Sequence, residues 1–249
     1  MRGLPCPPAT SRAFENAGAH ADQPYSDGVD EGEHCSVFEL RTYTLQPGSR
    51  AAFVELFEER FIEPQEGEGM HLIGQFEDRT VPDRFVWIRG FASMASRQAA
   101  LRAFYGGAVW QQYRQAANSM IVDSDDVHLL KRAVATPTID STAPRSAGLP
   151  QTALDNIDIV VSPAQSPLSS WQGSVFGGSS QLLGILRTEH AQNTFPQLPV
   201  IEGRDVLVAI IRRAPTSDGL PASADNLDRL AAYGQRSLQL RPTPRSALR

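Results

Sequence analysis

The sequence predicts an α+β fold built from split β-α-β units, and two observations carry this prediction. From residue 37 to residue 132, apolar residues recur at strand spacing and at helix spacing in the order β-α-β-β-α-β. From residue 153 to the end, the same order returns in a weaker form. With 249 residues, 41% of them hydrophobic, the chain is long enough for two such units.

The first strand and the first helix have clear signals. Residues 37–45 form the strand, because Phe38 and Leu40 alternate with polar neighbours. A helix then begins after Ser49, which is a suitable N-cap, and its apolar spacing predicts an end at Pro64.

The rest of the first unit follows without a long gap. Residues 70–76 and 85–91 predict two strands whose short link favours a hairpin. A second helix spans residues 93–117, and the glycine pair at 106–107 is expected to divide it. Residues 125–132 supply the fourth strand and complete the ferredoxin-like pattern.

Composition divides the chain into four parts. Residues 1–36 have no apolar period and predict a disordered leader, and residues 136–152 have the Pro, Ser, Thr and Ala content of a linker. The two folded units are therefore expected at residues 37–135 and 153–249.

The second unit is interpreted as a diverged internal duplication of the first. Its strands are expected at residues 157–161, 182–188, 205–213 and 237–240, with a short helix at 227–233. Gly184 lies in its second strand, where Gly74 lies in the first unit. Different strand orders in the two halves would make this hypothesis wrong.

The segment Phe38-Glu39-Leu40-Arg41-Thr42-Tyr43-Thr44-Leu45-Gln46-Pro47-Gly48 resembles the opening of the NIPSNAP family. The likeness continues to the helix of Trp110, and residues 186–189 and 193–196 resemble the second half of tandem members. The resemblance implies a dimeric or tandem α+β barrel. It implies no single reaction, because related barrels include cofactor-free monooxygenases, haem-degrading enzymes and ligand-binding proteins.

Charge and apolar runs exclude several partners. The net charge of −5 argues against a nucleic-acid partner, which needs a basic face. No run approaches the roughly 20 apolar residues of a membrane span, so a soluble cytoplasmic protein is expected. No HxxxH or CxxC spacing predicts a metal site, and the sequence identifies no cofactor.

A polar site is expected on one face of the first sheet. The apolar strand residues are expected on the helix-facing side: Phe38, Leu40, Leu72, Phe76, Val86, Ile88, Val127 and Leu129. Their neighbours then face the barrel interior: Glu39, Arg41, Tyr43, His71, Gln75, Trp87, Arg89, Asp126 and His128.

These side chains suggest a ligand pocket. Arg41 or Arg89 would hold an anionic or carbonyl group, Tyr43 and Trp87 would form an aromatic wall, and Glu39 and Gln75 would complete the ligand-binding set. His71 or His128 would act as acid and base, because imidazole titrates near neutral pH.

The same residues have a structural interpretation. Glu39 and Arg41 can form an ion pair between strands, Trp87 can fill the barrel, and the histidines can cap strand ends.

Two function hypotheses follow. The first is a NIPSNAP-domain protein that binds a small ligand or a protein partner through the barrel cleft. The second is a cofactor-independent monooxygenase or isomerase acting on an aromatic or carbonyl compound. A homo-oligomer is expected if one chain does not close the barrel.

Overall fold

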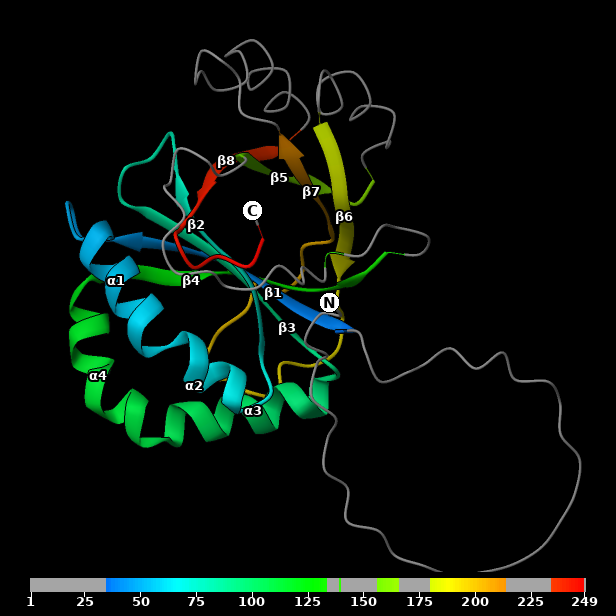
Figure 1. The fold of residues 1–249 in the computed structure, drawn as a ribbon. Helices are drawn as coiled ribbons and strands as arrows, with labels where there is room; N and C mark the ends of the chain where they lie inside the picture. Colours follow the sequence, from blue (N-terminus) through cyan, green and yellow to red (C-terminus); the bar gives the residue numbers. More distant parts are fainter. Residues whose placement is uncertain (1–34, 134–138, 140–155, 166–179, 214–233, 249) are drawn as a thin grey trace, which may run out of the picture.

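The structure is a computed structural model that describes residues 35–133, 139, 156–165, 180–213 and 234–248 (Figure 1). Most of the expected leader and linker, and the expected helix at 227–233, lie outside these residues.

The first half has the predicted order of strands and helices. Its elements are β1 (Val37–Leu45), α1 (Arg50–Arg60), α2 (Ile62–Gly67), β2 (His71–Asp78), β3 (Arg84–Phe91), α3 (Met94–Gly106), α4 (Ala108–Ser119) and β4 (Ile121–Arg132).

Two details of the first half correct or refine the prediction. The expected helix end at Pro64 is wrong, because Pro64 lies in the first turn of α2. Proline is tolerated there, since the first backbone N–H groups of a helix have no intrahelical acceptor to lose. The division at the glycine pair is confirmed, with Gly107 between α3 and α4.

The second half contributes four strands. They are β5 (Asn156–Pro163), β6 (Ser180–Thr188), β7 (Val206–Arg213) and β8 (Arg236–Pro242). Each overlaps a predicted strand.

All eight strands form one closed barrel in the order β1-β3-β2-β8-β5-β7-β6-β4. The halves meet where β2 pairs with β8 and where β4 pairs with β6, and every pairing is antiparallel. The chain therefore closes the barrel without a second copy, and its carboxyl end lies against the barrel (Figure 1).

The two halves have the same strand order. It is β4-β1-β3-β2 in the first half and β8-β5-β7-β6 in the second. Each second strand also shifts register immediately before its glycine, between Leu72 and Gly74 and between Leu182 and Gly184. Both findings support the duplication, which stays a hypothesis.

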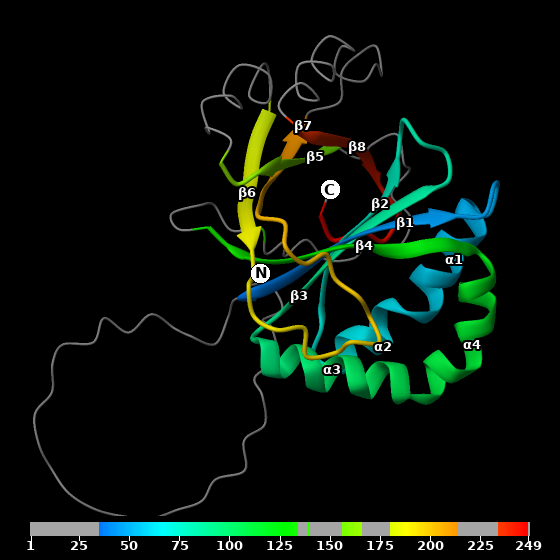
Figure 2. The same ribbon diagram turned by 180° about the vertical axis from the view of Figure 1, so that it is seen from behind.

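The barrel interior is filled with apolar side chains from both halves. The first half provides Phe38, Leu40, Ile73, Phe76, Val86, Ile88 and Leu130, and the second provides Ile157, Ile159, Val161, Leu183, Leu186, Val206, Val208, Ile210, Leu238 and Leu240. Helices α1 to α4 cover the outer face of the first-half sheet (Figures 1 and 2).

The predicted faces of β1 and β3 are therefore exchanged. Phe38, Leu40, Val86 and Ile88 face the interior, and so does Phe76 of β2. The other face of β1 and β3 meets the helices, and its side chains are those of Glu39, Arg41, Tyr43, Trp87 and Arg89. Alternation separates two faces, but when both are covered it does not tell which one meets the helices.

On β4 the predicted faces are confirmed. Leu129 packs in the helix-facing cluster. Asp126 and His128 lie opposite Thr42 and the interior residue Leu40, on the other face.

Candidate functional site

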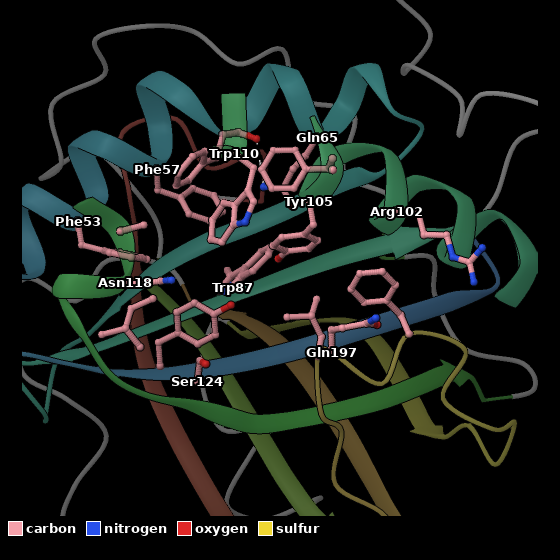
Figure 3. A pocket seen from close by; sticks show the side chains of 18 residues that line it. Phe53, Phe57, Gln65, Trp87, Arg102, Tyr105, Trp110, Asn118, Ser124 and Gln197 are labelled. Carbon is pink, nitrogen blue, oxygen red and sulfur yellow. Dashed lines mark hydrogen bonds between the residues drawn. The ribbon is translucent and has the colours of Figure 1, made fainter. Parts of the chain in front are cut away.

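A cavity of about 530 Å³ lies between the helices and the outer face of the sheet (Figure 3). We call it the aromatic pocket. Its lining residues are Tyr43, Phe53, Phe57, Phe61, Gln65, Trp87, Arg102, Phe104, Tyr105, Gly106, Trp110, Ala117, Asn118, Ile121, Ser124, Phe195, Gln197 and Leu198.

The walls of the pocket are aromatic rings held against one another. The centroids of Phe57 and Trp87 lie 5.0 Å apart, and those of Tyr105 and Trp110 lie 4.9 Å apart, both in edge-on arrangements. Tyr43 meets Trp87 edge-on at 5.9 Å. Such packing fixes the rings, so the cavity is shaped before any ligand enters.

The second half completes this pocket. Phe195, Gln197 and Leu198 lie in the segment between β6 and β7, which reaches from the second half to the helices (Figure 2). The ring of Phe195 stacks on Tyr105 of α3, with centroids 5.9 Å apart and 27° between the planes.

A buried charge cluster lies beside the pocket, with one carboxylate shared by three arginines. Glu39 accepts from Arg41 Nη1 at 2.9 Å and from Arg89 Nε at 2.8 Å, both from the sheet. It also accepts from Arg97 Nε of α3 at 2.6 Å. All four residues are fully buried.

The cluster therefore carries an excess of positive charge. Among the described residues, Glu39 is the one carboxylate bonded to these three guanidinium groups. Three positive charges and one negative charge leave a net charge of +2 in a region of low dielectric, where charges interact strongly.

Two pocket residues connect the cluster to the cavity. Arg41 Nε donates to the hydroxyl of Tyr43 at 3.1 Å, and Arg89 Nη1 donates to Gln65 Oε1 at 3.0 Å. The Arg41 guanidinium also lies 5.6 Å from the ring centroid of Trp87. We call Tyr43, Gln65 and Trp87 the pocket floor.

Burial and charge set the protonation states here. Burial raises the pKa of Tyr43, and the opposing effect of Arg41 does not cancel it, so the phenol is protonated at neutral pH. Its oxygen already accepts from Arg41, which leaves the hydroxyl hydrogen to donate. Burial alone would raise the pKa of Glu39, but the three arginines hold it well below its usual range, so Glu39 is ionised.

The structure brings the predicted ligand residues Arg41, Tyr43, Trp87, Arg89 and Glu39 together, on the helix side of the sheet. Gln75 is buried opposite Trp87 and does not line the pocket.

The two predicted catalytic histidines lie elsewhere. His71 begins β2. His128 lies with Asp126 and Arg236 at a second cavity of about 570 Å³, and neither histidine lines the aromatic pocket. Burial and the nearby Arg236 and Arg204 lower the pKa of His128 although Asp126 opposes them.

Several residues of the aromatic pocket and of the charge cluster beside it were missed by sequence reasoning. Arg97 precedes Ala100, Leu101 and Phe104 at helical spacing, so its place on the buried face of α3 was readable from the pattern. Trp110 was visible as a helix residue, but Phe195 gave no local signal because its partners are distant in sequence.

The described residues contain no group of three or more His, Cys, Asp or Glu arranged to hold a metal ion. Within the same part of the chain, none of the helices is long and apolar enough to cross a membrane.

Solved structures with a similar fold include NIPSNAP proteins. A NIPSNAP family protein of unknown function from Agrobacterium tumefaciens is 25% identical, with a TM-score of 0.39, over 42% of this chain and 94% of that chain. A NIPSNAP domain protein from Burkholderia xenovorans is 17% identical, with a TM-score of 0.38, over 41% of this chain and 98% of that chain.

A protein from Lactobacillus acidophilus, provisionally named a monooxygenase, is 12% identical, with a TM-score of 0.47, over 84% of this chain and 94% of that chain. No curated protein matches the chain.

The family model of NIPSNAP matches residues 38–137. This range includes β1 to β4, the four helices and the charge cluster. Over residues 38–137, the chain is therefore similar to the NIPSNAP family.

Proposed function

We propose that the protein binds a small aromatic compound with an anionic or carbonyl oxygen in the aromatic pocket. The observation that carries this proposal is the buried excess of positive charge directly behind an aromatic cavity. An anionic ligand would supply the negative charge that Glu39 alone does not provide.

The pocket floor supports a defined orientation of the ligand. The rings around the cavity suit a flat apolar body, which gains about 25 cal/mol for each Å² removed from water. The polar groups of the floor are the Tyr43 hydroxyl, the Gln65 side chain and the indole N–H of Trp87. A ligand oxygen would therefore lie at Tyr43, with Arg41 behind it.

This proposal moves the ligand site from the barrel cleft to the other face of the sheet. The barrel interior holds apolar side chains from both halves. The polar residues that suggested a ligand are on the helix side, where the cavity lies.

The enzyme hypothesis stays as a second candidate because of Tyr43. A protonated phenol that accepts from Arg41 can stabilise the oxyanion of an enolate or phenolate. Since neither His71 nor His128 lines this pocket, proton transfer here would fall to Tyr43 or to the substrate itself. Oxygen consumption in the presence of a bound phenol or enol would distinguish an oxygenase from a binding protein.

The test is a thermal-shift screen with naphthols, quinones, aromatic carboxylates, fatty acids, flavin and haem. A ligand at a hundredfold excess over its Kd stabilises the fold by about 2.7 kcal/mol. We expect aromatic acids or phenols to raise the Tm of the wild type and to lose this effect in Tyr43→Phe. Tyr113→Phe is the control, because Tyr113 is on α4 outside the pocket. If no aromatic compound raises the Tm, the proposal fails.

A further inference from the structure

We infer that the segment 193–198 of the second half selects the ligand of the aromatic pocket. In this inference Phe195 limits the length of the bound ring system, and Asn193 is a positioning residue that holds the segment on α3. The inference rests on the proposed function. We call this segment the strap.

The strap lies within residues 189–201, and both ends of this longer segment are hydrogen-bonded to β4. Glu189 N donates to Leu129 O at 2.9 Å, and Ile201 N donates to Val127 O at 2.8 Å. The chain therefore leaves β4 and returns to it two residues away, and the part between these anchors is free to reach the helices.

The tip of the strap is held by two side chains of α3. Arg97 Nη1 donates to Asn193 Oδ1 at 3.1 Å, and Gln98 Nε2 donates to Thr194 O at 2.9 Å. Because Arg97 also donates to Glu39, the strap and the pocket floor share one buried ion-pair network.

Asn193 also shapes the strap itself. Its Nδ2 donates to Leu198 O at 2.9 Å, and its Oδ1 accepts from Phe195 N at 3.1 Å. One side chain thus fixes the turn that presents Phe195 and attaches that turn to Arg97.

Phe195 is the aromatic residue of the strap at the pocket, where Gln197 and Leu198 also lie. Its side chain is buried, lines the pocket and stacks on Tyr105. A ring system longer than the cavity must displace Phe195, so its truncation should admit longer ligands. Loss of Asn193 should leave the floor unchanged but let the strap open more often, which raises the dissociation rate.

The experiment uses the full chain with two probes, 2-naphthoate and the longer anthracene-2-carboxylate. Phe195→Ala is expected to improve the affinity for the longer probe relative to the shorter one by about tenfold, and Phe195→Leu should change it in the same direction with less loss of packing. Asn193→Ala is expected to raise the dissociation rate several-fold in stopped-flow tryptophan fluorescence. Asn193→Asp keeps the acceptor oxygen for Arg97 and Phe195 N but loses the donor to Leu198 O, so its release rate should lie between those of the wild type and Asn193→Ala. The exposed neighbour change Gln192→Ala should have no effect.

The outcomes separate this inference from the proposed function. If the wild type binds the probes but the Phe195 and Asn193 variants keep wild-type selectivity and release rates, the strap inference is overturned and the pocket proposal stands. If the wild type binds neither probe, both are overturned.

Discussion

Glu39→Gln is predicted to destabilise the protein strongly, because it removes the carboxylate that three buried arginines share. Arg41, Arg89 and Arg97 are fully buried, and each lies within 2.6 to 2.9 Å of Glu39. Glutamine keeps the volume of the side chain and one acceptor oxygen, but it leaves three uncompensated positive charges.

Removing one partner of a buried ion pair costs about 3–5 kcal/mol. For a chain of this length, each kcal/mol lowers the Tm by about 2–4 °C, so the expected loss is about 6–20 °C. Equilibrium unfolding in urea would measure the free-energy change directly.

The stability that Glu39 contributes should also depend on pH. The folded pKa of Glu39 is held below its usual range, so its contribution is fully present above about pH 4.3, the unfolded value, and is lost as the pH falls further. Glu39→Gln should remove that part of the acid sensitivity.

Two variants make the test specific. Asp158→Asn is the matched control in the second half, where Asp158 is buried and pairs with the partly exposed Arg213, so a smaller loss is expected. Adding Arg97→Met to Glu39→Gln should recover part of the stability, because one uncompensated cation is removed. A loss below about 1 kcal/mol for Glu39→Gln, the value of an exposed pair, would show that Glu39 does not stabilise the fold through the three buried arginines.

Three further predictions concern stability. The pKa of His128 is lowered in the fold, so the stability that its neutral form contributes is present above about pH 6.5 and is lost as the pH falls. Between pH 7 and 5, the urea midpoint should therefore decline less in His128→Gln than in the wild type. An equal decline of the midpoint in both proteins would contradict this. Gly74→Ala should lower the free energy of unfolding by about 1–3 kcal/mol, because the added Cβ would lie 2.3 Å from the buried ring of Phe76. The control Gly67→Ala places its Cβ in open space and should cost nothing. Equal urea midpoints for the two variants would argue against the close packing at Gly74. Phe57→Ala should lower the free energy of unfolding by about 3–5 kcal/mol in the same assay, since it removes a ring from the centre of the aromatic wall. The control Val122→Ala, on the surface, should be neutral. Comparable losses in the two variants would contradict this packing.

The strands were predictable because their signals are local. The alternation around Phe38 and Leu40 predicted β1 over its full range, and glycine and proline marked the turns. The end of the first helix was not predictable from Pro64 alone. Whether a proline ends one helix or begins the next depends on the backbone turn at Phe61, which separates α1 from α2.

Which polar residues share one face of the strands was predictable, but the side of the sheet on which that face lies was not. Glu39, Arg41 and Arg89 share one face by alternation. That face meets the helices because it packs on Gln65 and Arg97, and these contacts depend on how the helices fold back onto the sheet.

The strap could not be predicted because it depends on contacts across the whole chain. Asn193 is 96 residues from Arg97, and Phe195 is likewise distant in sequence from its partner Tyr105. No local pattern marks such a contact. The second half therefore contributes more than packing to the candidate site, which its weak sequence likeness to the first half did not indicate.

The ratio of the Kd values of 2-naphthamide and 2-naphthoate, obtained by isothermal titration calorimetry, would show whether the buried positive charge attracts a ligand into the aromatic pocket. The two compounds share the ring system and differ in charge. With a buried charge of +2 behind Tyr43, we expect the carboxylate to bind at least about tenfold more tightly than the amide, a difference of about 1.4 kcal/mol, and Tyr43→Phe to reduce this ratio. Equal affinities for the two compounds, or a preference for the amide, would contradict it.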